Sequence, residues 1–134
     1  MMKPSFLAMT AFLLAQPVLA DDLAALSTTA MAITGDIKFD DFEIVFENGE
    51  KLAFDALVAD RFIADGQSVP ASVYSVAPSA APELLNGNRL CGNEPVTFLA
   101  SWIDGDVTAI AVFDTPEQPE SDATMCALYT YVYP

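Results

Sequence analysis

Cysteines and carboxylates are the side chains of this chain that could do chemistry. The sequence holds two cysteines, Cys91 and Cys126, nineteen Asp and Glu residues and no histidine. Without histidine there is no Ser-His-Asp triad and no histidine base or metal ligand. The cysteines lack C-x-x-C spacing, and in an oxidising compartment we expect them to form a disulfide. That bond leaves no thiolate nucleophile, so we predict no enzyme activity and no cofactor.

Paired carboxylates are the catalytic chemistry that remains, because Asp or Glu can act as both acid and base, as in glycosidases. Most acidic residues fall at predicted turns or on outward strand positions. Asp55 and Glu94 are the two that the pattern does not place at the surface. A carboxylate-dependent hydrolase is therefore an alternative function. The acidic "DGD" at 104–106 matches no EF-hand loop, so we predict no metal site.

The charge of the chain favours a cationic partner. Its formal net charge is −14, and all nineteen acidic residues follow Ala20. Such a field repels nucleic acid and attracts basic proteins. We predict no nucleic-acid partner.

The first twenty residues have the pattern of a secretory signal peptide. Lys3 precedes an apolar run over 6–15, and the segment ends with small residues at Ala20. The run is too short to span a bilayer, and no later segment is more apolar, so we expect no integral membrane association. Cleavage after Ala20 removes Lys3, takes the net charge from −14 to −15 and leaves one domain, 21–134, in the periplasm or outside the cell.

Five further side chains are candidates for contact with a partner or ligand. Tyr129, Tyr131 and Tyr133 alternate along "CALYTYVYP" and point to one face of a strand. We place Cys126, Leu128, Thr130 and Val132 on the core face, so that the tyrosine rings cover the other face with their hydroxyls in water, as structural cover or a contact surface. Arg89, two residues before Cys91, and the single tryptophan, Trp102, complete the set.

Short alternating apolar runs between Gly, Asp, Asn and Pro predict antiparallel strands. We expect strands over 32–39, 60–64, 71–77 and 125–133, and two hairpins over 41–57 and 96–113. In the first hairpin a three-residue loop, Glu47-Asn48-Gly49, pairs Phe42 with Phe54 and Ile44 with Leu52, which puts these apolar side chains on one face. In the second, an Asp104-Gly105 turn pairs Trp102 with Val107. Residues 21–32 suggest a short helix, and 81–85 one turn.

These elements predict an all-β fold, a small antiparallel barrel or sandwich of seven or eight strands in mainly meander order. In a meander the strands starting near Val96 and Met125 begin at the same end of the sheet. Cys91 and Cys126 would then meet at one rim, so the topology and the disulfide support each other.

Two functions follow from this pattern. The first is an exported binding module that docks a cationic protein through its charge and its aromatic residues. The alternative is a carrier of a small apolar ligand, because Ala100, Ala109 and Ala111 leave room beside Phe98 and Trp102 on one face of the second hairpin. The same alanines could equally accommodate the large aromatic side chains across the core.

Overall fold

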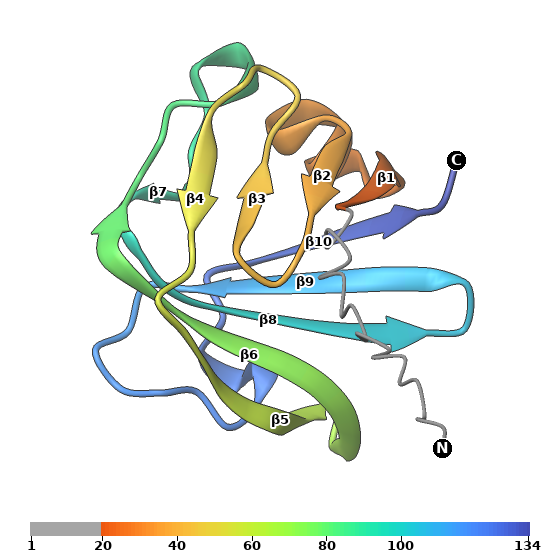
Figure 1. The fold of residues 1–134 in the computed structure, drawn as a ribbon, viewed down its shortest axis with the longest axis vertical. Helices are drawn as coiled ribbons and strands as arrows, with labels where there is room; N and C mark the ends of the chain where they lie inside the picture. Colours follow the sequence, from red (N-terminus) through yellow and green to blue (C-terminus); the bar gives the residue numbers. More distant parts are fainter. Residues whose placement is uncertain (1–19) are drawn as a thin grey trace, which may run out of the picture.

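The computed structural model describes residues 20–134, so the predicted signal peptide lies outside the described residues except for Ala20. Ten strands and three short helical turns make up the described chain (Figure 1). The strands are β1 Asp21–Ala25, β2 Ile37–Phe39, β3 Glu43–Val45, β4 Lys51–Ala53, β5 Ala56–Ala64, β6 Gln67–Ala80, β7 Leu90–Asn93, β8 Val96–Asp104, β9 Val107–Phe113 and β10 Ala127–Val132; the turns are η1 Ala30–Thr34, η2 Leu85–Gly87 and η3 Asp122–Thr124.

Nine of these strands form one antiparallel sheet in the order β4-β3-β2-β1-β10-β9-β8-β6-β5. The all-β, mainly meander prediction is confirmed, with more strands than the seven or eight expected. The two ends of the order, β4 and β5, are consecutive in the chain. Phe54 N donates to Phe42 O and the next amide, Asp55 N, to Ser75 O, so the chain passes from one end of the sheet to the other and curls it into a barrel-like shape.

The register of the β3–β4 hairpin is as predicted. Ile44 pairs with Leu52, and Gly49 adopts φ +92° in the loop that returns the chain to Glu50. Ile44 and Leu52 are buried, which accounts for the register, because a slip of one residue would expose both. Phe42, which the prediction also placed on the core face, lies just before β3 and is 64% exposed.

The β8–β9 hairpin turns one residue later than predicted. Asp104 pairs with Val107, and the turn residues are Gly105 and Asp106. Only Gly105 of the two has a positive φ, +63°, the pattern of a type II′ turn. Trp102 consequently pairs with Ala109 rather than Val107, and this two-residue shift leaves every side chain on its predicted face.

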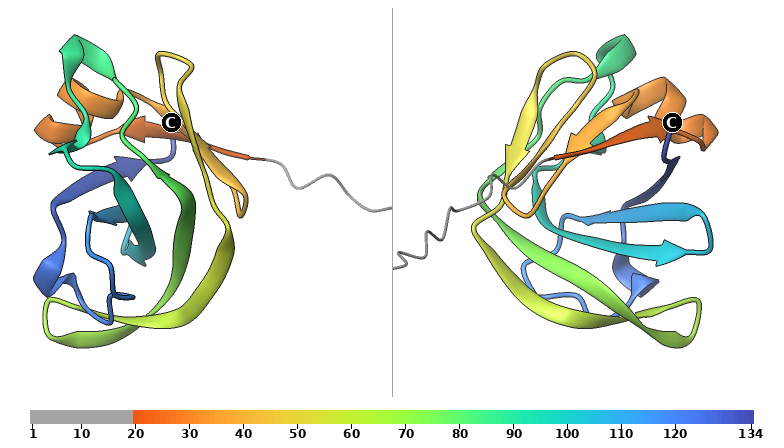
Figure 2. Two further views of the ribbon diagram at one scale, coloured as in Figure 1. Left: turned by 90° about the vertical axis from the view of Figure 1, so that its left-hand side faces the viewer. Right: turned by 45° about the vertical axis from the view of Figure 1, so that its right-hand side comes forward.

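The β5–β6 hairpin is much longer than the two short strands predicted over 60–64 and 71–77. Asp65 and Gly66 form its tip with φ of +51° and +78°, as in a type I′ turn, and Ala64 pairs with Gln67. The tip is fixed to the loop before β10: Ile63 N donates to Glu120 O, and Asp65 N donates to Asp122 Oδ2 at 2.9 Å. Figure 2 shows this hairpin curving under the rest of the sheet.

The N-terminal segment differs from the predicted helix over 21–32. Its first five residues form β1, which pairs with both β2 and β10 and buries Leu23. The helical turn comes later, at Ala30–Thr34, and shortens the strand predicted over 32–39 to Ile37–Phe39. Pairing on both edges of β1 explains why strand structure prevails over local helix preference.

Two apolar clusters cover opposite faces of the β8–β9–β10 sheet. The tyrosine core, on the side of β1–β4, includes Leu99, Ile110, Tyr129 and Tyr131. The smaller tryptophan cluster, on the side of the β5–β6 hairpin, consists of buried Phe62, Ala64, Val73, Ala100, Ala111 and Phe113, with Trp102 and Leu128 packed against it. Both faces of the central strands are therefore covered, which explains the nearly continuous apolar run of β9.

No helix among the described residues is long and apolar enough to cross a membrane.

Candidate functional site

The predicted disulfide is present and joins Cys91 to Cys126. Cys91 lies in β7 and Cys126 directly precedes β10, so the bond ties the two segments at one rim, as the meander predicted. It also holds Leu90, whose carbonyl accepts a hydrogen bond from the Tyr129 hydroxyl at 2.8 Å.

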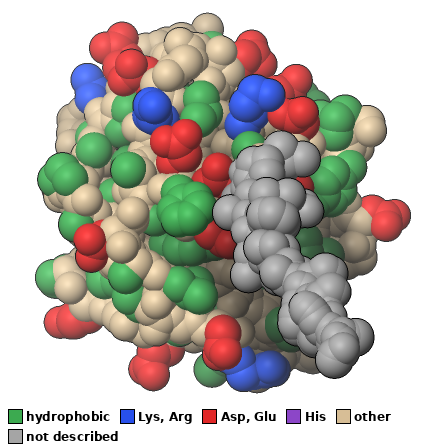
Figure 3. Space-filling view, in the orientation of Figure 1, with side chains coloured by type: hydrophobic (Ala, Val, Ile, Leu, Met, Phe, Trp, Pro, Cys, Tyr) green, Lys and Arg blue, Asp and Glu red, His purple; other side chains and the backbone are tan. Residues whose placement is uncertain are grey.

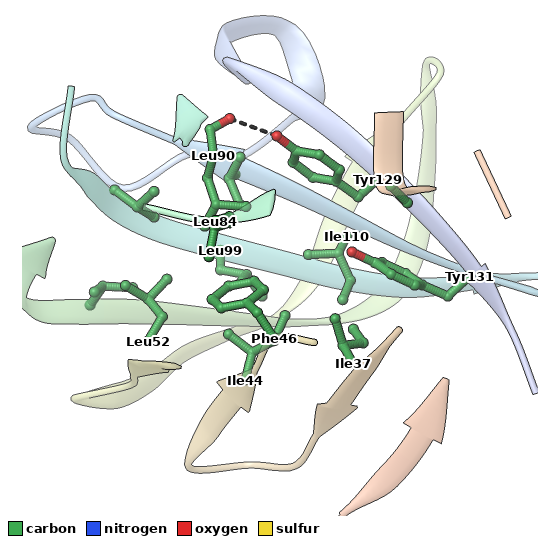
Figure 4. Packing of buried hydrophobic residues seen from close by; sticks show 14 of the residues in the cluster. Ile37, Ile44, Phe46, Leu52, Leu84, Leu90, Leu99, Ile110, Tyr129 and Tyr131 are labelled. Carbon is green, nitrogen blue, oxygen red and sulfur yellow. Dashed lines mark hydrogen bonds between the residues drawn. The ribbon is translucent and has the colours of Figure 1, made fainter. Parts of the chain in front are cut away.

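Tyr129 and Tyr131 lie inside the tyrosine core rather than on a wetted face (Figure 4). They are 1% and 0% exposed. The Tyr131 hydroxyl is 2.8 Å from Thr34 Oγ1, so both phenols have buried protein partners. The core face of β10 is thus the tyrosine face, opposite to the one predicted, because partners from distant segments satisfy the hydroxyls. Burial raises the pKa of Tyr129 to about 12 and that of Tyr131 still further.

Tyr133 and Arg89 occupy the surface. Tyr133 is 60% exposed, and its hydroxyl donates to Asp21 Oδ2 at 3.2 Å. Arg89 donates to the Ala81 carbonyl and lies 3.8 Å from Glu83 Oε1, so it holds the loop before β7 together. The structure does not bring Tyr133 or Arg89 to the cavity that contains Trp102.

Trp102 lies at the boundary between the tryptophan cluster and an open cleft. Its ring is 5.2 Å from that of Phe62, centroid to centroid, on the packed side. On the other side lies a cleft of about 480 Å³ between the tip of the β5–β6 hairpin and the sheet, which we call the Trp102 cleft. Its lining is Ala64, Asp65, Gln67, Val69, Trp102, Ile103, Asp104, Val107, Ala109, Asp122, Leu128 and Thr130.

Apolar groups and carboxylates share this cleft. Val69, Leu128 and Ala109 stand beside Trp102, whereas Asp65, Asp104 and Asp122 bring three carboxyl groups. The Asp122 carboxylate accepts the Asp65 amide and so fixes the hairpin tip. Asp104 is exposed, and its carboxylate makes no hydrogen bond or ion pair with another described residue, so its charge is free for a ligand.

The alanine prediction fits this cleft in part. Ala109 borders it beside Trp102, but Ala100 and Ala111 are fully buried in the tryptophan cluster and leave no space of their own. They accommodate Phe62 and Phe113 instead, the alternative that the sequence left open.

A second hollow, of about 350 Å³, is lined by residues of β1, β2 and β3 and their neighbours in the chain and is also acidic. Its carboxylates are engaged within the protein: Asp22 pairs with Lys38 at 2.7 Å, Asp36 accepts the Ala25 amide, and Glu47 accepts the Asp36 amide. It therefore offers a cationic ligand less than the Trp102 cleft does.

The described residues hold no group of three or more acidic, cysteine or histidine side chains that could bind a metal ion. Asp55 and Glu94, the two carboxylates singled out for hydrolysis, are both exposed, and neither lines the Trp102 cleft. Sequence reasoning found Trp102 but missed Asp65, Asp122 and Val69. The Asp65-Gly66 pair was a usable turn signal, whereas nothing in the sequence announces that Asp122 approaches it.

Comparisons of the chain with protein-family models, curated proteins and solved structures give no match.

Proposed function

We propose that this chain is an exported binding module, without catalytic activity, that docks a cationic segment of a protein partner in the Trp102 cleft. The observation that carries the proposal is one cleft containing an aromatic wall, apolar neighbours and three carboxyl groups. The disulfide Cys91–Cys126 and the signal-peptide pattern support export, because structural disulfides persist in oxidising compartments.

A lysine or arginine side chain matches both halves of the cleft. Its methylene stem can lie against Trp102 and Leu128 while its charged end approaches Asp104 and Asp122. A cation over an indole face gains further attraction from the ring. The formal net charge of −14 attracts a basic partner over a longer range. On the face shown in Figure 3, acidic side chains lie among hydrophobic and basic ones.

A fluorescence titration tests this proposal, since Trp102 is the only tryptophan. Oligolysine added to the disulfide-bonded protein should change its emission at low salt and lose affinity as salt rises. A neutral peptide of the same length should have no effect. If oligolysine leaves the emission unchanged, or binds equally well at high salt, a cationic ligand is excluded from the cleft.

Matched variants locate the charge that matters. Asp104→Asn should weaken oligolysine binding by about two- to fivefold, because it removes one exposed carboxylate of the cleft. Asp55→Asn makes the same charge change at an exposed residue outside the cleft and should alter affinity less. Equal losses in both variants would mean that only net charge binds the peptide.

A carrier of an apolar ligand is the second candidate, favoured by the apolar side chains of Val69, Ala109 and Leu128 around the cleft. The same fluorescence assay separates the two. A neutral aromatic or fatty ligand that changes Trp102 emission independently of salt supports the carrier, whereas salt-dependent binding of peptides alone supports docking.

A further inference from the structure

β6 and β8 separate at the Trp102 cleft and leave part of the sheet without a partner strand. The two strands pair from Ser75–Phe98 to Ser72–Ser101, and there the pairing stops. Beyond that point residues 67–70 pair only with β5, and residues 102–104 only with β9. Figure 1 shows β6 and β8 moving apart toward the tip of the β8–β9 hairpin.

The separation is fixed by contacts at the end of the hairpin. Ile63 N donates to Glu120 O, and Ile63 also forms a bridge with Ser121. With the Asp65–Asp122 hydrogen bond, these contacts hold the hairpin tip against the loop before β10. Pro70 has no N–H, so this part of β6 lacks one of the donors that a ladder with β8 requires. Residues 102–104 of β8 therefore have no partner strand on the side of β6.

Hollows lie at this point on both faces of the sheet. One is the Trp102 cleft, on the face of the tryptophan cluster. The other has a volume of about 430 Å³ and is lined by Asp60, Pro70, Ala71, Ser72, Ser101, Trp102 and Ile103. Of these, Ser101 and Ile103 alternate with Trp102 along β8 and so point to the opposite face of the sheet. The two hollows share Trp102 and Ile103, so they are the two sides of one gap between β6 and β8.

We infer that the gap between β6 and β8 receives an extended cationic segment of the partner, which pairs its main chain with residues 102–104 of β8. This inference rests on the proposed function and specifies the form of the partner. In an extended segment alternate side chains point to opposite faces. One set would enter the Trp102 cleft with its carboxylates, and the other set the hollow beside Asp60 and Ser72. An unpaired strand edge flanked by side-chain pockets is the arrangement used in binding by strand addition.

The probe peptide should therefore alternate long basic residues with small polar ones. A Lys-Thr repeat places all its lysines on one side of an extended chain and its threonines on the other. Its matched control is the same sequence with N-methyl groups on alternate peptide nitrogens, which keeps every charge but removes donors and blocks pairing. Methylation is made in both phases of the alternation, because either phase could face β8.

Affinity is measured by Trp102 emission at constant salt, and amide hydrogen exchange is measured over 102–104 with and without peptide. We expect one methylated phase to bind about tenfold more weakly than the unmodified peptide, from lost main-chain hydrogen bonds. We also expect slower exchange of an amide within 102–104 when the unmodified peptide is bound.

The outcomes separate the inference from the proposed function. If all peptides bind equally and salt weakens them all, a cationic ligand stands but strand pairing is overturned. Binding without added protection at 102–104 also overturns it. If no Lys-Thr peptide changes Trp102 emission, while oligolysine does, an extended alternating ligand is wrong. If neither binds, the inference and the proposed function fall together.

Discussion

The two faces of the β8–β9–β10 sheet are covered in different ways. On one face, β1–β4, the helical turn η1 and the strand β7 all contribute side chains to the tyrosine core. The tyrosine hydroxyls there form hydrogen bonds with η1 and β7, which are distant in the sequence. On the other face one hairpin and one loop cover the tryptophan cluster, and the cover stops at Trp102. A face closed from several directions provides stability, whereas a face closed from one side leaves room and free charge for a ligand.

Alkaline pH should break the tyrosine core with the largest effect. Burial, aided by the hydrogen bond to Asp41, raises the pKa of Tyr74 to about 12; burial does the same for Tyr129 and raises that of Tyr131 further, from an ordinary 10.0. The folded state thus favours the neutral phenols, so their stabilisation is complete below pH 10 and is lost as pH rises through 12.

We expect the fold to be lost above pH 12, with tyrosinate absorbance and circular dichroism changing together. Tyr133 is exposed, and the Asp21 carboxylate raises its pKa, but its ionisation should precede unfolding. Ionisation of all four tyrosines near pH 10 without unfolding would contradict the closed core.

Removing the disulfide should come next. The double variant Cys91→Ser, Cys126→Ser should lower the free energy of unfolding by about 3 to 4 kcal/mol. Because the bond holds β7, whose Leu90 carbonyl accepts the Tyr129 hydroxyl, tyrosine signals should change more than Trp102 emission. Urea unfolding and fluorescence check both. A larger change in Trp102 emission than in the tyrosine signals would contradict this prediction, because it would mean that the disulfide mainly stabilises the tryptophan cluster.

A matched pair of leucines compares the two faces directly. Leu99 is fully buried in the tyrosine core, whereas Leu128 is half-buried beside the cleft. Leu99→Ala should cost about 3 kcal/mol and Leu128→Ala about 1 kcal/mol, because the second leaves less of a closed cavity. Urea denaturation of both variants measures the difference. Equal costs would show that the second face is as tightly closed as the first.

The smallest effect is expected at the border of the cleft. Ala111→Leu should destabilise the protein by about 1 to 3 kcal/mol, because Ala111 is 0% exposed and tightly packed. Ala109→Leu should cost less than about 1 kcal/mol, because its longer side chain can extend into the Trp102 cleft. That variant should also weaken oligolysine binding. Thermal unfolding and the Trp102 titration read the two effects, and similar destabilisation by both substitutions would argue against an open cleft at Ala109.

Local patterns in the sequence were sufficient to predict much of the fold. The alternation around Ile44 and Leu52 predicted both the β3–β4 pairing and its loop, because burial of one face allows a single register. Meander order brought Cys91 and Cys126 to one rim. The β8–β9 register was harder to predict, because a turn at Asp104-Gly105 and a turn at Gly105-Asp106 both bury the same side chains.

Long-range pairing explains what the sequence could not predict. Tyr131 forms a hydrogen bond with Thr34, which is 97 positions away in the sequence, and Tyr129 forms one with Leu90, which is 39 positions away. When those partners are not known, a tyrosine side chain is expected to keep its hydroxyl in water, so the tyrosine face of β10 was predicted to be exposed to solvent. The Trp102 cleft likewise depends on the contact of Asp65 with Asp122, which no local pattern reveals.

The most direct test of the account is a map of amide chemical shifts in the isotopically labelled, disulfide-bonded protein during titration with the Lys-Thr peptide. We predict changes at the hairpin tip over 64–71, along β8 and β9 over 102–109, and at Asp122 and Leu128, with the residues of β1–β3 unchanged. Changes centred instead on the hollow around Asp22, Asp36 and Glu47 would contradict it, because they would place the bound peptide at β1–β3, away from the Trp102 cleft and the gap between β6 and β8.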